Sequence, residues 1–331
     1  MTTHIPDTSF SPSCEDLITS LQHAQREVRK VVVGQERMLE RLFVCLIAGG
    51  HILLEGVPGV GKTVTLVALA SAVGGTFSRI QFTADLMPSD IVGTRIYKAN
   101  SQTFEVEKGP IFANFILADE INRAPAKVQS ALLEVMAEKQ VTIAGKTEKL
   151  KNPFMVLATQ NPLESEGVYA LPDAQRDRFL MRLLVNMPTP TEEAGILERM
   201  EYTCPVASEV LSPESIASLN AQALQNHVNS EVKDYAVRIV LATRSPAEHN
   251  LPSLEGVIQH GVSPRATISL LRSARALSLL RNRDFVTPQD VYDIAYDVLN
   301  HRLSLTYDAQ ADGITVDDVL VTILATVPAL A

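Results

Sequence analysis

The amino-acid sequence predicts an α/β fold, an αβα sandwich around a parallel five-stranded sheet, followed by a small all-helical C-terminal domain. Two observations lead to this prediction. Between residues 50 and 186, short apolar runs alternate with helical patterns, whereas the chain after residue 188 shows helical patterns alone. Continuous apolar runs that alternate with helices are typical of a parallel sheet covered on both faces.

The five predicted strands are short apolar runs rich in Ile, Leu, Val and Phe. They lie at residues 51–55, 78–82, 115–119, 154–159 and 183–186. The segment between the third and fourth runs illustrates the helices that are expected to connect them. It places four apolar side chains on one stripe of a helix: Val128, Leu132, Val135 and Met136. Such helices would cover the faces of the sheet.

Residues 94–109 and 140–150 interrupt this alternation. Each segment contains a strand pattern, a polar turn and a second strand pattern, which is typical of a β-hairpin. Both hairpins are expected to project from loops of the sheet. The pattern leaves open whether they have a function or are plain surface loops.

The change of pattern near residue 188 predicts a boundary between two domains. We expect a mobile N-terminal arm at residues 1–15, a core with both hairpins at residues 16–188, and a helical domain at residues 189–331. Thr287 and Asp290 resemble a capping box at the start of one helix. Four helices are expected to begin at a proline that follows a Ser or Thr cap, namely at Pro190, Pro213, Pro264 and Pro288.

The composition is that of an ordinary soluble globular protein. The 331 residues are 46% hydrophobic and 20% charged, and no apolar run reaches the roughly 18 residues of a membrane-spanning helix. The first residues lack the basic and apolar regions of a signal peptide. The three cysteines are widely spaced, which argues for a reducing compartment and against a disulfide framework or a thiolate zinc site. We expect a cytoplasmic protein without stable membrane insertion.

The charge and the histidines bear on possible partners. The formal net charge of −9 weakly disfavours nucleic acid, since proteins that bind DNA phosphates usually carry basic patches. The seven histidines are scattered and form no pair with metal-ligand spacing. Neither nucleic acid nor a transition metal is expected.

The sequence GVPGVGKT at residues 56–63 follows the first strand and begins a helix. This succession of strand, Gly-rich loop and helix is typical of a P-loop that binds ATP or GTP. Its glycines let backbone N–H groups point at phosphate oxygens beside the helix N-terminus. Lys62 is expected to reach the β- and γ-phosphates, and Thr63 to hold Mg²⁺. The remaining residues of the predicted nucleotide site are Gly56, Pro58, Gly59, Val60, Gly61 and Val64.

The third and fourth strands end in polar residues at the edge where α/β sheets bind ligands. Asp119 fits a direct or water-mediated Mg²⁺ ligand, and Glu120 would polarise the attacking water as a general base. The alternative is a pair of solvated acids, but the P-loop in the same sheet favours hydrolysis. Asn161 follows the fourth strand, where an amide can bind the γ-phosphate or the water without adding charge.

Three arginines are candidates for phosphate contacts. Arg265 lies in the first turn of the helix that begins at Pro264. A cation there opposes the helix dipole by roughly 0.3–1 kcal/mol, which predicts an anionic partner for it. Arg176 and Arg178 precede the last strand, and local chemistry leaves open whether they are surface charges or catalytic groups.

With these residues assembled, the chain resembles the MoxR family of AAA+ ATPases. The resemblance runs through VVGQE, LLEGVPGVGKT, RIQFTADLMPSDIVGT, KGPIFANFILADEINRAPAKVQSALLEVMAE, VLATQNPLESEGVYALPDAQRDRF and GVSPRA, and covers about residues 30–303. It implies an αβα ATPase core, a helical lid domain and a ring assembly that is usually hexameric. It also implies that the two hairpins are the helix-2 insert and the pre-sensor-1 insert of this branch, which includes magnesium-chelatase subunits.

The resemblance also implies roles for single residues. Asn161 corresponds to sensor 1, Arg265 to sensor 2, and Arg178 to the arginine finger that completes a neighbouring subunit's site. Family sequences usually have an apolar residue where this chain has Arg176, which leaves open which of the two arginines is the finger. The backbone around Val33 and Gly34 is expected to line the adenine pocket.

The function that the resemblance implies is that of a Mg²⁺-dependent ATPase that remodels, matures or inserts cofactors into partner protein complexes. Family members typically work with a partner that contains a von Willebrand factor A domain. A nucleic-acid motor is the alternative, in which the hairpins would grip a strand, but their mixed charges disfavour it. A scaffold that binds nucleotide without hydrolysing it is a third reading, which the set of Lys62, Asp119, Glu120 and Asn161 disfavours.

Overall fold

A parallel five-stranded sheet forms the centre of the structure. The computed structural model describes residues 14–57, 59–100, 102–161, 168–202 and 205–329. The strands are all parallel and lie in the order β2-β5-β8-β1-β9, so the P-loop strand β1 lies between β8 and β9. Their bounds are β1 Ile52–Glu55, β2 Phe77–Gln81, β5 Phe115–Asp119, β8 Met155–Gln160 and β9 Met181–Leu184.

The five-stranded parallel sheet predicted from the sequence is confirmed, but the last strand begins two residues earlier than expected. It forms at Met181–Leu184 rather than at residues 183–186. Arg182 interrupts the apolar run, yet it lies in register with Leu53, and its Nε donates to Glu55 at 2.7 Å. Glu55, which compensates the charge of Arg182, lies far away in the sequence. The residues around Arg182 therefore could not predict this pairing.

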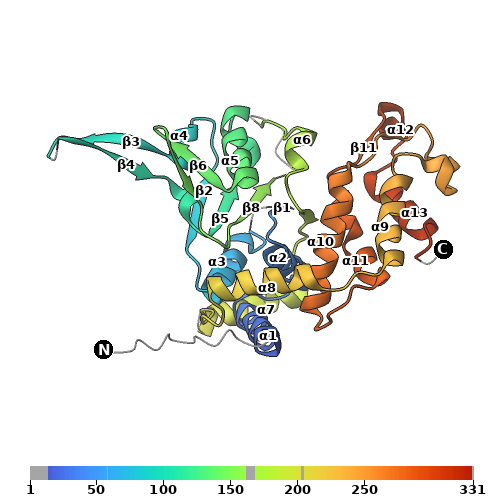
Figure 1. Ribbon diagram of the computed structural model, residues 1–331, viewed down its shortest axis with the longest axis horizontal. Helices are drawn as coiled ribbons and strands as arrows, with labels where there is room; N and C mark the ends of the chain where they lie inside the picture. The colour runs from blue at the N-terminus through green and yellow to red at the C-terminus, as the bar shows by residue number, and fades with distance from the viewer. Residues whose placement is uncertain (1–13, 58, 101, 162–167, 203–204, 330–331) are drawn as a thin grey trace, which may run out of the picture.

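Helices cover both faces of the sheet, as predicted, because neighbouring residues of a strand point to opposite faces. Ile52 and Leu54 belong to one buried cluster, whereas Leu53 belongs to the other. Figure 1 shows α4 and α5 on the second of these faces and the remaining core helices on the first. The core helices are α1 Cys14–Val31, α2 Glu36–Ala48, α3 Lys62–Ala72, α4 Pro88–Val92 and α5 Ala126–Glu138.

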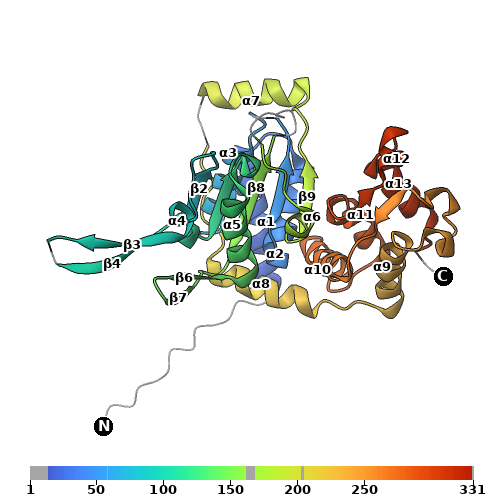
Figure 2. The same ribbon diagram turned by 90° about the horizontal axis from the view of Figure 1, so that it is seen from above.

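Antiparallel hairpins lie at both places where the sequence predicts them. The longer hairpin pairs β3 (Gly93–Lys98) with β4 (Thr103–Lys108), and the shorter pairs β6 (Gln140–Ile143) with β7 (Lys146–Lys149). Figure 2 shows the β3–β4 hairpin extending far from the body of the molecule. An ion pair between the side chains of Lys108 and Glu148 joins the two hairpins.

Short elements complete the core, and two longer helices link it to the C-terminal part. The short ones are η1 Pro110–Phe112, η2 Ile121–Arg123 and α6 Asp173–Arg176. Helices α7 (Pro190–Tyr202) and α8 (Pro213–Gln225) follow β9, and α8 packs on α1 and α2. Arg199 of α7 donates to the carbonyl of Arg29 at the end of α1 at 2.8 Å, and Asn220 of α8 donates to the carbonyl of Ile47 in α2 at 2.6 Å.

The C-terminal part is a helical bundle that stands beside the core (Figure 1). Pro190, Pro213, Pro264 and Pro288 are each the first residue of a helix, and the predicted capping box of Thr287 and Asp290 is formed. The bundle is not purely helical, because β10 pairs with β11. Its elements are α9 Ser230–Ala242, η3 Pro246–His249, η4 Pro252–Leu254, β10 Ile258–His260, α10 Pro264–Leu280, α11 Pro288–Leu299, β11 Ser304–Leu305, α12 Tyr307–Ala311 and α13 Val316–Thr326.

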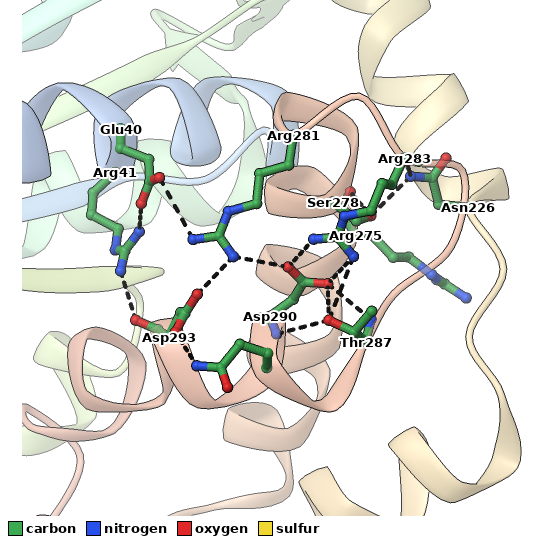
Figure 3. A network of polar contacts seen from close by, with 11 residues as sticks. Glu40, Arg41, Asn226, Arg275, Ser278, Arg281, Arg283, Thr287, Asp290 and Asp293 are labelled. Atoms are coloured by element: carbon green, nitrogen blue, oxygen red, sulfur yellow. Dashed lines mark hydrogen bonds and ion pairs between the residues drawn. The ribbon is translucent and has the colours of Figure 1, made fainter.

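An ionic network joins α2 of the core to α10 and α11 of the bundle (Figure 3). At the end of α10, Arg281 donates to Asp293 at 2.6 Å and to Asp290 at 3.1 Å, and it lies 3.8 Å from Glu40 of α2. Arg41 of α2 donates to the backbone carbonyl of Asp293 at 2.6 Å. Because these groups pair with one another, buried charges are tolerated where the two parts meet.

Within the described part of the chain, no helix combines the length and the apolar character needed to span a lipid bilayer.

Candidate nucleotide-binding site

The Gly-rich loop leads from β1 into α3 through left-handed backbone conformations. Gly59 has φ 89° and Gly61 has φ 81°, a region that residues with a Cβ rarely adopt. Gly61 is the N-cap of α3, so the helix begins at Lys62. Free N–H groups in the first turn of a helix face whatever lies in front of it, and they favour an anion.

Gly56 holds the loop close to the neighbouring strand end. A Cβ on this residue would lie 2.5 Å from the carbonyl oxygen of Val185, just beyond β9. The carbonyl of Gly56 also accepts a hydrogen bond from Lys62 Nζ at 2.6 Å. Burial lowers the pKa of Lys62, and the charges of Asp119 and Glu120 oppose this shift.

A cavity of about 350 Å³ lies in front of this loop. The structure brings together here most of the predicted P-loop residues, the acidic pair of Asp119 and Glu120, and Asn161. The lining consists of Gly56, Gly59, Gly61, Lys62, Thr63, Val64, Arg79, Gln81, Asp119, Glu120, Thr159 and Asn161. Pro58 lies outside the described residues. Val60 is buried behind the loop and contributes to a second cavity.

Asp119 is held by two neighbours at the end of β5. Its Oδ1 accepts from the hydroxyl of Thr159 at 2.6 Å, and its Oδ2 accepts from Arg79 Nη2 at 2.6 Å. Both partners lie on the strands that flank β5. The carboxylate is therefore fixed at the cavity with one oxygen paired to a cation.

Glu120 has an unusual backbone conformation for a residue with a side chain, with φ 56°. Its N–H donates to Thr159 Oγ1 at 2.8 Å. Its Oε2 accepts from Gln81 Nε2 at 2.8 Å and lies 3.3 Å from Arg123 Nε. This turn directs the carboxylate sideways along the strand ends, where a polar residue of β2 holds it.

The oxygen donors at the cavity fit Mg²⁺. The hydroxyl of Thr63 and the carboxylate of Asp119 line the same space, and hard oxygen ligands are those that Mg²⁺ prefers, with its other positions taken by water and phosphate. Among the described residues, no cluster of three or more His, Cys, Asp or Glu side chains could hold a metal ion without such additional ligands.

A second cavity, of about 420 Å³, adjoins the first and is mostly apolar. Gly59, Gly61 and Val64 line both cavities. Val33 lines the second, as expected for an adenine pocket, whereas Gly34 packs against the side chain of Glu192 and is not part of the lining. The other lining residues are Val31, Val32, Gln35, Val60, Pro188, Ile196, Arg199 and Pro205.

Arg178 and Arg265 do not line either cavity. The exposed Arg178 donates from Nη1 to the carbonyl of Leu133 in α5 at 2.6 Å. Arg265 has the anionic partner that its place in the helix predicts, but that partner is the Asp177 carboxylate, 3.2 Å away. Arg176 pairs with Asp173 in its own short helix. The structure thus places the three arginines together and apart from their own chain's cavities.

Sequence reasoning missed three residues that line the first cavity, namely Arg79, Gln81 and Thr159. The sequence pattern could have indicated two of them, Arg79 and Gln81. In the run SRIQF, polar residues alternate with Ile80 and Phe82, which indicates a strand with one polar face. In the register of β2 with β5, Gln81 lies opposite Asp119, so this polar face meets the acidic end of β5.

The strand order, the Gly-rich loop and the acidic strand end define a P-loop nucleotide-binding protein of the AAA+ class. Residues 51–181 match the family model described as "ATPase family associated with various cellular activities (AAA)". Residues 255–323 match the model of an AAA lid domain.

Relatives define the family more closely. The chain is 52% identical to "Chaperone MoxR1" of Mycobacterium tuberculosis, over 94% of this chain and 82% of the relative. It is 33% identical to "Protein MoxR" of Methylorubrum extorquens, over 92% and 94% of the two chains. A crystal structure of a candidate ATPase from Cytophaga hutchinsonii superposes with a TM-score of 0.91, at 45% identity over 95% of this chain and 96% of that one. The chain belongs to the MoxR family of AAA+ ATPases.

Proposed function

We propose that this protein hydrolyses ATP with Mg²⁺ and uses the energy to remodel partner proteins. The observation that carries the proposal is the first cavity, where the P-loop lysine, an acidic pair and a polar strand tip meet. Lys62 would bind the β- and γ-phosphates, while Thr63 and Asp119 would hold Mg²⁺, which neutralises phosphate charge when bound. Glu120 would take a proton from the attacking water, and Asn161 would position that water.

The second cavity supports a purine nucleotide as the ligand. It is largely apolar and shares its glycine wall with the phosphate cavity, as a site for a purine beside its phosphates requires. Its far wall comes from residues after 188, including Ile196 and Arg199 of α7. We propose a domain boundary at residue 188, with residues 16–188 as the core, so that the nucleotide would contact both domains.

We propose that Arg178 acts on the nucleotide of a neighbouring subunit. The cation is exposed and lies away from its own cavity, which suits a residue that completes a site across a subunit interface. In other NTPases an arginine finger contributes about 10³–10⁵ in rate. Arg265 pairs with Asp177, the residue directly before Arg178, so we assign Arg265 to the same interface. Arg176 is tied to Asp173 and is the weaker candidate. We propose that the assembly is a ring, a hexamer as is usual in the family.

We propose that the hairpins contact client proteins. Tyr97 and Phe104 pack against each other on the β3–β4 hairpin, with ring centroids 5.1 Å apart, and remain more than half exposed. Arg95 lies over the Phe104 ring at 4.5 Å. Exposed aromatic residues with a neighbouring arginine are typical of protein-binding surfaces. The clients would be cytoplasmic complexes that need maturation or cofactor insertion, reached with a partner that contains a von Willebrand factor A domain.

ATPase assays on two variants test the enzymatic part. Lys62→Ala should weaken nucleotide binding, whereas Glu120→Gln should retain binding and lower kcat by about 10²–10⁴. Binding is measured with a fluorescent ATP analogue and turnover by phosphate release. Full turnover by Glu120→Gln would exclude Glu120 as the base, and absence of turnover in the unchanged protein would favour a scaffold that only binds nucleotide.

Client identification tests the remodelling part. The Glu120→Gln variant, loaded with ATP, is purified from its native lysate, and the proteins bound to it are identified. The matched control is the same variant with Tyr97→Ala and Phe104→Ala. Protein complexes that depend on the hairpin aromatics support the proposal, whereas recovery of nucleic-acid-binding proteins alone would favour a motor on DNA or RNA.

A further inference from the structure

The loop that carries Arg178 is short and is held from within the molecule. It connects α6 with β9 and spans residues 177–180. Along it, Asp177 is half-buried, Arg178 is exposed and Phe179 is completely buried. The position of Arg178 is therefore set by what holds the residues on either side of it.

Arg302, just after α11, holds both sides of Arg178. Its Nε donates to Asp177 Oδ1 at 2.7 Å, and its Nη2 donates to the carbonyl oxygen of Phe179 at 2.6 Å. Its Nη1 lies 3.3 Å from the carbonyl of Leu180. The side chain is only 2% exposed. One guanidinium thus binds three of the four residues of the loop.

The two residues before Arg302 bind the same segment. His301 donates from Nε2 to the carbonyl of Phe179 at 3.2 Å, and Asn300 donates from Nδ2 to the carbonyl of Arg182 at 3.0 Å. A carbonyl oxygen has two lone pairs, so Phe179 can accept from both His301 and Arg302. Three consecutive residues of the bundle therefore fasten the chain from Asp177 into β9.

Simple attachment of the bundle to the core does not account for this arrangement. The ionic network between α2 and α11 already joins the two parts, and Arg41 there pairs with the buried Asp297 at 2.7 Å. A buried arginine needs hydrogen bonds to compensate its desolvation. Arg302 makes most of these hydrogen bonds to residues 177–180, the finger loop. Its other acceptors are the carbonyl of Val298 in α11 and Ser269 Oγ in α10.

We propose that Arg302 is a positioning residue for the arginine finger, which couples the place of Arg178 in the neighbouring site to the position of the helical bundle. The inference rests on the proposed role of Arg178 in a neighbouring subunit. Asp177 binds Arg302 through one oxygen and Arg265 through the other. The first turn of α10 and the segment after α11 therefore both hold the loop in place. A shift of the bundle would therefore move the finger of the same subunit.

Mixed assemblies of variant subunits test this coupling. Arg302→Met should lower kcat by about 10–100-fold, because a misplacement of about 1 Å can cost 10²-fold, while its own ATP affinity stays unchanged. Mixed with Lys62→Ala subunits, which have an intact finger and a defective P-loop, it should regain activity that neither variant has alone. Mixed with Arg178→Ala subunits, it should regain none, because both variants then lack a working finger.

The controls separate this inference from the finger itself. Arg178→Ala mixed with Lys62→Ala should also recover activity. If it does not, the role of Arg178 in a neighbouring subunit is excluded, and so is the role of Arg302 that depends on it. If that pair recovers but Arg302→Met with Lys62→Ala does not, the positioning role alone is overturned. Arg238→Met, which removes hydrogen bonds to the carbonyls of Pro328 and Ala329 rather than to the loop, should leave kcat unchanged.

A milder substitution covers the case in which Arg302→Met does not fold. Asp177→Asn keeps the shape of the side chain but removes its charge from Arg302 and Arg265. It should show a smaller loss of kcat with the same pattern of recovery in mixtures. Recovery with Arg178→Ala subunits, or none with Lys62→Ala subunits, would contradict the proposal.

Discussion

His51 makes the free energy of unfolding depend on pH. It lies buried before β1, where its Nδ1 accepts from the N–H of Val156 at 3.0 Å and its Nε2 donates to the carbonyl of Met136 at 3.2 Å. Burial lowers the pKa of His51 from 6.5 to about 4. The unfolded chain therefore binds a proton on this ring at a higher pH than the folded chain does. The stability from the neutral ring is fully present above pH 6.5 and is lost as the pH falls toward 4.

The expected loss can be compared with that of a variant without the titrating ring. Between pH 6.5 and pH 5 the span is 1.5 pH units, and at about 1.36 kcal/mol per unit the loss is about 2 kcal/mol. Urea unfolding of the unchanged protein and of His51→Gln at pH 7 and pH 5 measures it. His301 is also buried with a lowered pKa, but it contributes equally to both proteins. Equal losses of stability in the two proteins would refute the argument.

Further substitutions test the loop, the acidic strand end and a helix cap. Gly56→Ala places a Cβ against the carbonyl of Val185 and should cost about 1–3 kcal/mol in urea unfolding; unchanged stability would mean that the loop can move away. Arg79→Ala frees an oxygen of Asp119 and should lower the Mg²⁺ concentration for half-maximal ATPase activity, by up to about fivefold for an exposed ion pair worth roughly 1 kcal/mol. A higher Mg²⁺ requirement would show that Arg79 supports the metal. Thr287→Ala should lower stability by about 1 kcal/mol in thermal unfolding, with Thr287→Ser as the control that retains it.

The sequence was most informative where structure depends on neighbouring residues. The P-loop follows from glycines at fixed spacing between an apolar strand and a helix, and the strand ends place Asp119 and Asn161 at one edge of the sheet. The helix that begins at Pro288 follows from its cap residues. These features can be predicted without knowing which residues far apart in the sequence are in contact.

Residues paired across the chain could not be predicted in this way. The anion that meets Arg265 is Asp177, which lies 88 positions earlier in the sequence. Arg302 carries no local signal at all, because its role depends on where the end of α11 meets the finger loop. The roles assigned to Arg178 and Arg265 likewise depend on a neighbouring subunit and stay predictions.

The base of the β3–β4 hairpin gives it the mechanics of a lever. Each strand has six residues, so the hairpin reaches roughly 20 Å, and a tilt of about 15° at its base would move the tip by roughly 5 Å. At that base, a Cβ on Gly93 would lie 2.6 Å from the nitrogen of Gly109, and a Cβ on Gly109 would lie 2.2 Å from the carbonyl oxygen of Ile91. Because the backbones of Gly93, Gly109 and Ile91 touch without an intervening side chain, a rotation of α4 would be passed directly to the hairpin and enlarged at its tip.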